Sequence, residues 1–108
     1  MSEVKELVRV SGALIQRNGG VLIVREPNGD WSLPGGTAEE GEEEIETLLR
    51  ELNEKLIEPI ILDVEVFRRF EPSEKSHRQT TIFLVEVGGM IRPNPKEIID
   101  TRWVNPAI

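Results

Sequence analysis

One amphipathic segment, residues 42–57, limits the folds open to this chain more than any other feature of its sequence. Its apolar side chains recur at the three- and four-residue spacing of a single helix face: Ile45, Leu48, Leu49, Leu52 and Leu56. Pro59 ends the helix, because the residue before a proline is pushed out of helical geometry. We therefore expect one long helix whose apolar stripe is buried against another layer of structure.

The segments on both sides of this helix favour β-strands. Residues 7–15 and 21–24 are mostly apolar, and Arg17-Asn18-Gly19-Gly20 lies between them. Asn-Gly is a strong hairpin signal, since both residues tolerate positive φ, so we expect a hairpin near the start of the fold. Three later segments have the same strand character: residues 60–70, 80–87 and 101–104.

A mixed sheet with one long helix predicts an α+β or α/β sandwich. The sequence contains no internal repeat, no low-complexity linker and no shift in composition that would mark a boundary. We therefore expect residues 1–108 to form a single domain.

The charge and residue content exclude several classes of function. The formal net charge is −7, whereas a general nucleic-acid binder needs a basic surface. The chain has no cysteine, which excludes disulfides, thiolate metal sites and thiol catalysis. No apolar run is long enough to cross a bilayer, and the first residues lack the layout of a signal peptide. We expect a cytoplasmic protein that binds neither membranes nor nucleic acid in general.

Two carboxylates on the helix are the best candidates for chemistry. Glu51 and Glu54 are three residues apart, so they project from neighbouring parts of one helix face and can share a hard cation such as Mg²⁺. Gly36 lets the backbone approach closely, and its carbonyl could add another oxygen. A cation held beside a diphosphate would polarise it and help to generate a nucleophilic water. The other acids near the helix start are interpreted as solvated surface charge: Glu39, Glu40, Glu43 and Glu44.

The spacing of these residues resembles the Nudix box, which runs G-x5-E-x7-R-E-U-x-E-E-x-G-U with U apolar. Gly36 is followed after five residues by Glu42, and after seven more by Arg50-Glu51-Leu52-Asn53-Glu54. The lead Trp31-Ser32-Leu33-Pro34-Gly35-Gly36 is similar to the usual entry into the box, and Arg102-Trp103-Val104 to a late strand of the family. The resemblance covers nearly the whole chain. It implies a MutT-like Nudix hydrolase with an α/β/α sandwich.

The resemblance also implies a role for each matching residue. Glu51 and Glu54 would be ligands of Mg²⁺ or Mn²⁺, with the Gly36 carbonyl as a further ligand. Arg50 would orient the glutamates. Glu42 would support the loop or the outer metal shell, although its place in the acidic run equally fits plain surface charge.

Three further site residues lie outside the box. Family members often add a carboxylate, as ligand or base, from a loop before the late strand; Glu97 is the first candidate and Asp100 the second. Arg25, at the end of a strand, is the best candidate for a phosphate contact, since arginine can grip phosphate oxygens in pairs. Trp31 would stack on a base or pack its loop against the sheet. The implied substrate is a small nucleoside diphosphate linked to another group.

The chain departs from the box at three positions. Lys55 stands where the family has the second glutamate of its E-E pair, Ile57 where it has glycine, and Glu58 where it has an apolar residue. Lys55 puts an ammonium beside the expected cation, so metal affinity should fall. This leaves three hypotheses: a Mg²⁺-dependent pyrophosphohydrolase, a nucleotide-binding or regulatory domain with weakened or lost hydrolysis, and a scaffold without a ligand.

A last departure concerns the end of the chain. The family usually closes its sandwich with another helix after the late strand, and this chain stops at Ile108. We therefore expect the C-terminal helix to be absent. The face that it would cover is then open to a second chain, which makes a homodimer a hypothesis from missing length.

Overall fold

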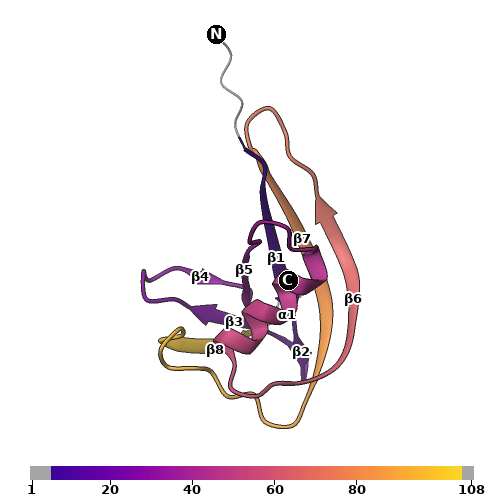
Figure 1. Ribbon diagram of the computed structural model, residues 1–108. Coiled ribbons are helices and arrows are strands. Elements are labelled where there is room, and N and C mark those ends of the chain that lie inside the picture. Colours follow the sequence, from indigo (N-terminus) through magenta and orange to yellow (C-terminus); the bar gives the residue numbers. More distant parts are fainter. Residues whose placement is uncertain (1–5, 106–108) are drawn as a thin grey trace.

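Two four-stranded sheets and one helix make up the residues that the computed structural model describes, 6–105 (Figure 1). The first sheet has the order β5 (Gly35–Thr37), β1 (Val8–Leu14), β7 (Arg78–Gly88) and β6 (Ile60–Phe70). The second contains β2 (Gln16–Arg17), β3 (Gly20–Arg25), β4 (Trp31–Ser32) and β8 (Asp100–Val104). β1 pairs with β7 in parallel, and the other pairs are antiparallel. This mixed arrangement with one helix confirms the α+β class.

The expected hairpin at the start of the fold is shorter than the sequence suggests. β3 pairs with the two-residue β2, not with β1, because the chain leaves the first sheet and enters the second at Ile15. The Ile15 carbonyl still accepts a bond from the Leu22 amide, 3.0 Å away. Asn18 and Gly19 have φ of 49° and 79°, as the Asn-Gly signal predicts.

The helix α1 (Glu44–Lys55) begins two residues later and ends two residues earlier than expected. Glu46 accepts a hydrogen bond from the backbone of Glu43 at 3.0 Å, which satisfies one of the free amides at the helix start. Leu48, Leu52 and Leu56 are at most 1% exposed and form the centre of the core.

The apolar stripe of the helix is narrower than predicted. Ile45 and Leu49 are each 36% exposed, so the prediction that both are buried is wrong. Three polar side chains of α1 are buried in addition to the leucines: Thr47, Glu51 and Lys55. α1 packs mainly on β1 and β5, and Ile45 borders an open hollow that is also lined by Val66 and Phe83. The buried polar side chains are the starting point for the site.

The C-terminal end of α1 has no glycine cap, and a distant loop takes over that role. Asn94 donates from its side chain to the Glu54 carbonyl at 2.9 Å and from its backbone to the Lys55 carbonyl at 2.8 Å. These are carbonyls that the last helical turn leaves without partners. Asn94 therefore connects the loop between β7 and β8 to the end of the helix.

Asn94→Ala should lower the free energy of unfolding by about 1 kcal/mol, because it removes the side-chain bonds to Glu54 and Lys96 while leaving the backbone bond. Urea unfolding followed by circular dichroism measures this change. Asn53→Ala is the matched control. Asn53 bonds only within its own helix and is exposed, so its loss should be neutral. Equal effects of the two variants would contradict the capping role.

No helix among residues 6–105 is long and apolar enough to cross a membrane. The C-terminal residues 106–108 lie outside the described part, so the expectation about the end of the chain is not addressed there.

Candidate functional site

Arg50 gathers the carboxylates that the sequence singled out. Its guanidinium donates to Glu42 at 2.7 and 3.1 Å, to Glu51 at 3.0 Å and to Glu54 at 3.3 Å. A fifth bond, at 3.0 Å, reaches the Thr37 carbonyl at the end of β5. The guanidinium thus joins three glutamates to the end of the strand β5 that precedes the helix, and the orienting role of Arg50 stays a prediction. Its own pKa is raised, chiefly by Glu42.

Glu42 is held more firmly than a surface glutamate. Besides Arg50, its Oε1 accepts a bond from the Thr47 hydroxyl at 2.9 Å and from the Glu39 amide at 2.8 Å. These donors favour the ionised form, and the bonds from Arg50 contribute most, so the pKa of Glu42 falls from its usual 4.5 to about 2. Of the two interpretations open for Glu42, its contacts favour support of the loop.

Glu51 is buried against the paired glycines. It is 8% exposed, and a methyl group at Gly36 would overlap its carboxylate. A side chain at Gly35 would in the same way collide with the Ser11 carbonyl on β1. The two glycines begin strand β5, which pairs with β1, and the absence of side chains there allows this close approach. Burial raises the pKa of Glu51, and Lys55 and Arg50 oppose that shift.

Lys55 points into the site and not into solvent. Its side chain is 9% exposed, and its ammonium lies 3.1 Å from Glu26 and 3.7 Å from Glu51. The ion pair with Glu51, one helical turn away, is therefore the longer of the two. The glutamate that the family has at this position would point to the same place, so the substitution puts a cation where a carboxylate is expected.

Glu26 is the site residue that sequence reasoning missed. It follows the last residue of β3 and begins a turn, and its amide bonds to the Asp30 carbonyl at 3.0 Å. Nothing in its local sequence connects it with a helix residue twenty-nine positions later. Only the packing of the second sheet beside α1 brings the two charges together.

A groove of about 300 Å³ opens beside these charges. Its lining residues include Glu26, Ser32, Gly35 and Gly36. The remainder is largely apolar, with Val10, Leu33 and Ile82 among its lining residues. Such a groove combines apolar surface with a few polar groups, which is the usual character of a small-molecule site.

Arg25 and Trp31 do not line this groove. They are register partners of β3 and β4, and Arg25 donates to the Gly29 carbonyl at 3.1 Å. The guanidinium of Arg102 lies 4.8 Å from the Trp31 ring centre and that of Arg25 lies 6.0 Å away. These contacts fit the alternative in which Trp31 packs its loop against the sheet. The substrate-binding role of both residues stays a prediction.

Glu97 and Asp100 are not joined to the Arg50 cluster. The Glu97 amide donates to the Asn94 carbonyl at 3.0 Å, and Asp100 accepts from the Thr101 amide at 2.8 Å. Asp100 pairs with Arg25 in the second sheet. Within residues 6–105 no group of three or more acidic, histidine or cysteine side chains is arranged to hold a metal ion. The role of Glu97 as ligand or base also stays a prediction.

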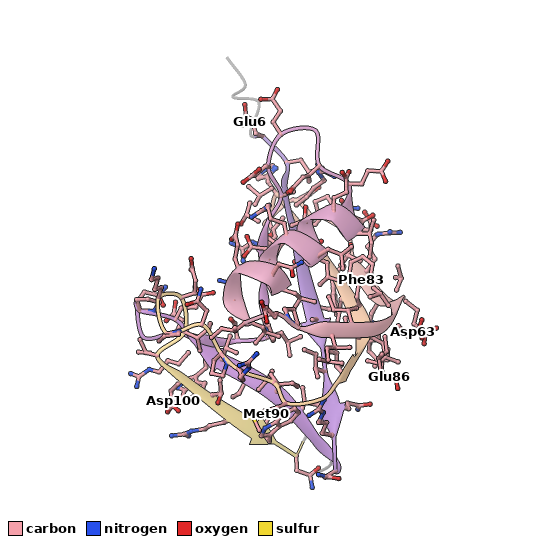
Figure 2. The ribbon with its side chains drawn as sticks, turned by 60° about the horizontal axis from the view of Figure 1, so that its bottom comes forward. Glu6, Asp63, Phe83, Glu86, Met90 and Asp100 are labelled. Atoms are coloured by element: carbon pink, nitrogen blue, oxygen red, sulfur yellow. The ribbon has the colours of Figure 1, made fainter. Side chains whose placement is uncertain are left out.

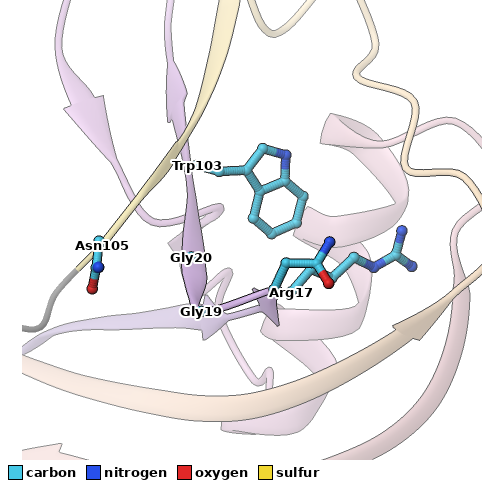
Figure 3. A pocket seen from close by; sticks show the side chains of 6 residues that line it. Arg17, Gly19, Gly20, Trp103 and Asn105 are labelled. Atoms are coloured by element: carbon cyan, nitrogen blue, oxygen red, sulfur yellow. The ribbon is translucent and has the colours of Figure 1, made fainter.

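A larger hollow, of about 490 Å³, lies at the other end of β3 (Figure 3). Arg17, Gly19, Gly20 and Trp103 are among its lining residues, and Figure 3 shows the Trp103 ring facing the Arg17 side chain. The Arg17 guanidinium donates a hydrogen bond to the Val87 carbonyl at 2.5 Å. No carboxylate is among the described residues that line it.

Comparison with protein families identifies this arrangement. Residues 5–107 match the NUDIX domain. The chain belongs to the Nudix family. No curated protein matches it, whereas solved Nudix structures share the fold.

Three solved Nudix structures illustrate the likeness. A nudix hydrolase family member from Chromobacterium violaceum is 23% identical, with a TM-score of 0.75, over 95% of this chain and 66% of its own length. A MutT structure described for Aliivibrio salmonicida and Vibrio cholerae is 20% identical, with a TM-score of 0.71, over 93% and 81%. An ADP-ribose pyrophosphatase from Streptococcus suis is 25% identical, with a TM-score of 0.65, over 90% and 72%. The assignment to the Nudix family from the sequence is thus confirmed, and MutT is among the solved structures that share the fold.

Glu42→Gln should destabilise this Nudix domain at neutral pH, because it weakens the bonds from Arg50. The folded pKa of about 2 lies below the usual 4.5, so ionised Glu42 stabilises the fold above pH 4.5, and this contribution is lost as the pH falls toward 2. Urea unfolding of both proteins from pH 7 down to pH 3 should therefore show a shrinking difference. Glu40→Gln, in the exposed loop, is the control and should have no effect at either pH. A pH-independent difference would rule out this linkage.

Proposed function

We propose that this chain hydrolyses the phosphoanhydride bond of a nucleoside diphosphate linked to another group, and that hydrolysis requires Mg²⁺ or Mn²⁺. The observation that carries the proposal is the set of bonds from Arg50 to Glu42, Glu51 and Glu54 in a Nudix domain. The family is one of hydrolases, and one similar structure is an ADP-ribose pyrophosphatase. Its substrate has the chemistry proposed for this chain.

The side chains around Arg50 are of the type that binds divalent cations. The family pattern has one more glutamate, at the position of Lys55. Carboxylate oxygens are the ligands that Mg²⁺ prefers. Five carboxylates, of Glu26, Glu39, Glu42, Glu51 and Glu54, form ion pairs with the two cations Arg50 and Lys55. This excess of negative charge favours a further cation. Glu51 and Glu54 would hold it with the Gly36 carbonyl, and the bound ion would polarise the phosphate and activate a water.

The chain's own residues would bind and orient the substrate. The groove beside Gly36 offers apolar side chains to a nucleoside, and Glu26 and Ser32 add hydrogen-bonding groups at its wall. A diphosphate lying at the Gly36 side of the groove would be next to the carboxylates that Arg50 holds. Arg50 would keep Glu51 and Glu54 in fixed positions, which lowers the entropy lost when the reacting groups are aligned.

Glu51→Gln and Glu54→Gln should each reduce metal-dependent turnover by a factor on the order of 10² or more, because each removes a ligand charge. Release of phosphate from nucleotide sugars, dinucleotides and nucleoside triphosphates measures this. Glu40→Gln serves as the control, since it changes the same charge on an exposed loop. Unchanged turnover by Glu51→Gln would contradict the proposed hydrolase function.

A second candidate function is binding of the nucleotide with weak or no hydrolysis. The observation that favours it is the buried ammonium of Lys55, 3.1 Å from Glu26 and 3.7 Å from Glu51. This ammonium offsets the negative charge of Glu51, which is one of the two proposed carboxylate ligands, and that of Glu26 beside it. Of the two proposed ligands, Glu54 is the more accessible, because 46% of its side chain is exposed compared with 11% for Glu51.

Lys55→Glu distinguishes the two functions. It removes the buried cation and places a third carboxylate beside Glu26 and Glu51, so the metal-free variant should unfold at a lower temperature. Mg²⁺ should then raise its unfolding temperature more than that of the wild type, because binding to the folded state stabilises it. If the wild type shows no metal-dependent hydrolysis and Lys55→Glu does, nucleotide binding would be favoured as the function of the wild type. Lys96→Glu, on an exposed turn, is the control for the charge change.

A further inference from the structure

The ammonium of Lys55 lies between two carboxylates that come from different parts of the fold. Its Nζ is 3.1 Å from Glu26, which follows the last residue of β3, and 3.7 Å from Glu51 on α1. Only 9% of the Lys55 side chain is exposed, so this cation is largely removed from water and depends on its two partners. Glu26 therefore faces the same point as Glu51, which is one of the two proposed metal ligands.

Gly36 lies against the same point from a third element. A methyl group at position 36 would overlap the Glu51 carboxylate, so this carboxylate occupies the space that a side chain would fill. Glu26 and Gly36 also line the same groove. The turn after β3, strand β5 and helix α1 thus meet around a cation. Carboxylate and backbone carbonyl oxygens are the ligands that Mg²⁺ and Mn²⁺ prefer.

Neither loop carboxylate that the sequence suggested is connected to this point. Glu97 and Asp100 form no ion pair among residues 6–105. Figure 2 shows Asp100 on β8, apart from the helix α1. Glu26, in contrast, contacts Lys55 directly. Of these three carboxylates, Glu26 is the one that the fold brings to the proposed ligands on the helix.

The position of Glu26 does not depend on which cation its carboxylate contacts. Its amide bonds to the Asp30 carbonyl at 3.0 Å, and its carbonyl accepts a bond from the Gly29 amide at 2.8 Å. These backbone bonds hold the residue in its turn beside the groove. Its side chain is 33% exposed, and among residues 6–105 its only ion pair is with Lys55. The carboxylate can therefore exchange one cation for another while the backbone stays in place.

We propose that Glu26 is a ligand of the divalent cation together with Glu51 and Glu54, and that this cation competes with the Lys55 ammonium for Glu26 and Glu51. Glu26 thereby supplies the carboxylate that the family pattern has at position 55. Two positive charges at one point repel each other, so the ammonium has to leave when the metal ion binds. The proposal rests on the metal ion of the proposed function, and it does not require hydrolysis.

Binding of Mn²⁺ to the whole chain, followed by electron paramagnetic resonance without a substrate, tests the proposal. Lys55→Met removes the ammonium and keeps a side chain of similar length, so it should raise the affinity for Mn²⁺ by a factor on the order of ten or more. In this background Glu26→Gln can no longer act through the ion pair with Lys55. It should lower the affinity by a similar factor, because it removes a ligand charge.

Two further variants in the Lys55→Met background complete the comparison. Glu40→Gln changes the same charge on an exposed loop and should have no effect. Glu97→Gln tests the alternative ligand that the sequence suggested. Circular dichroism checks that each variant is folded. An affinity for Mn²⁺ that Glu26→Gln leaves unchanged would overturn the proposal, and so would a folded Lys55→Met variant that binds Mn²⁺ no more tightly than the wild type.

The unaltered chain provides a measurement that does not depend on the folding of any variant. In protein with ¹³C-labelled glutamate, Mn²⁺ should broaden the side-chain carboxyl signal of Glu26 together with that of Glu51 and before that of Glu97, because paramagnetic broadening falls steeply with distance. A Glu26 signal that broadens only after that of Glu97 would contradict the assignment. A chain that binds Mn²⁺ through Glu26 but cleaves no nucleotide would contradict the proposed hydrolysis and leave Glu26 as a ligand.

Discussion

The arrangement of this site depends on the hydrogen bonds that the guanidinium of Arg50 donates. It holds three glutamates and the end of β5 with five hydrogen bonds. Like-charged carboxylates at such short range would otherwise repel one another, so the loop before the helix and the helix itself need a cation between them. Glu42 is the strongest partner in this set, as its pKa of about 2 indicates. The geometry of the glutamates is therefore a property of the folded chain itself.

Lys55 changes what that arrangement can do. A buried ammonium is stable only with close partners, and the chain provides Glu26 and Glu51. The helix and the turn after β3 are thereby connected through a salt bridge at the point where the family pattern has a carboxylate. In the proposed binding function, this ammonium takes the place of a metal ion beside Glu51.

The two edges of the first sheet, β5 and β6, differ in their surroundings. At one edge, β5 approaches β1 so closely that only glycine fits at position 35, and this packing places Glu51 beside the groove. At the other edge, five apolar side chains of β6 are at least half exposed, while Arg69 of the same strand bonds to Glu44 of α1. The groove therefore lies at the opposite edge of the sheet from these exposed side chains.

The sequence by itself determined the helix, the strands and the Nudix spacing, because each depends on residues that are neighbours along the chain. Helical spacing was enough to put Glu51 and Glu54 near Arg50, and Asn18-Gly19 was enough to place a turn. Only the tertiary structure decided which side of α1 is buried and which distant residues meet it. Glu26 and Asn94 reach the helix from other parts of the chain, and their contacts depend on how the second sheet and the loop before β8 pack, which no local pattern encodes.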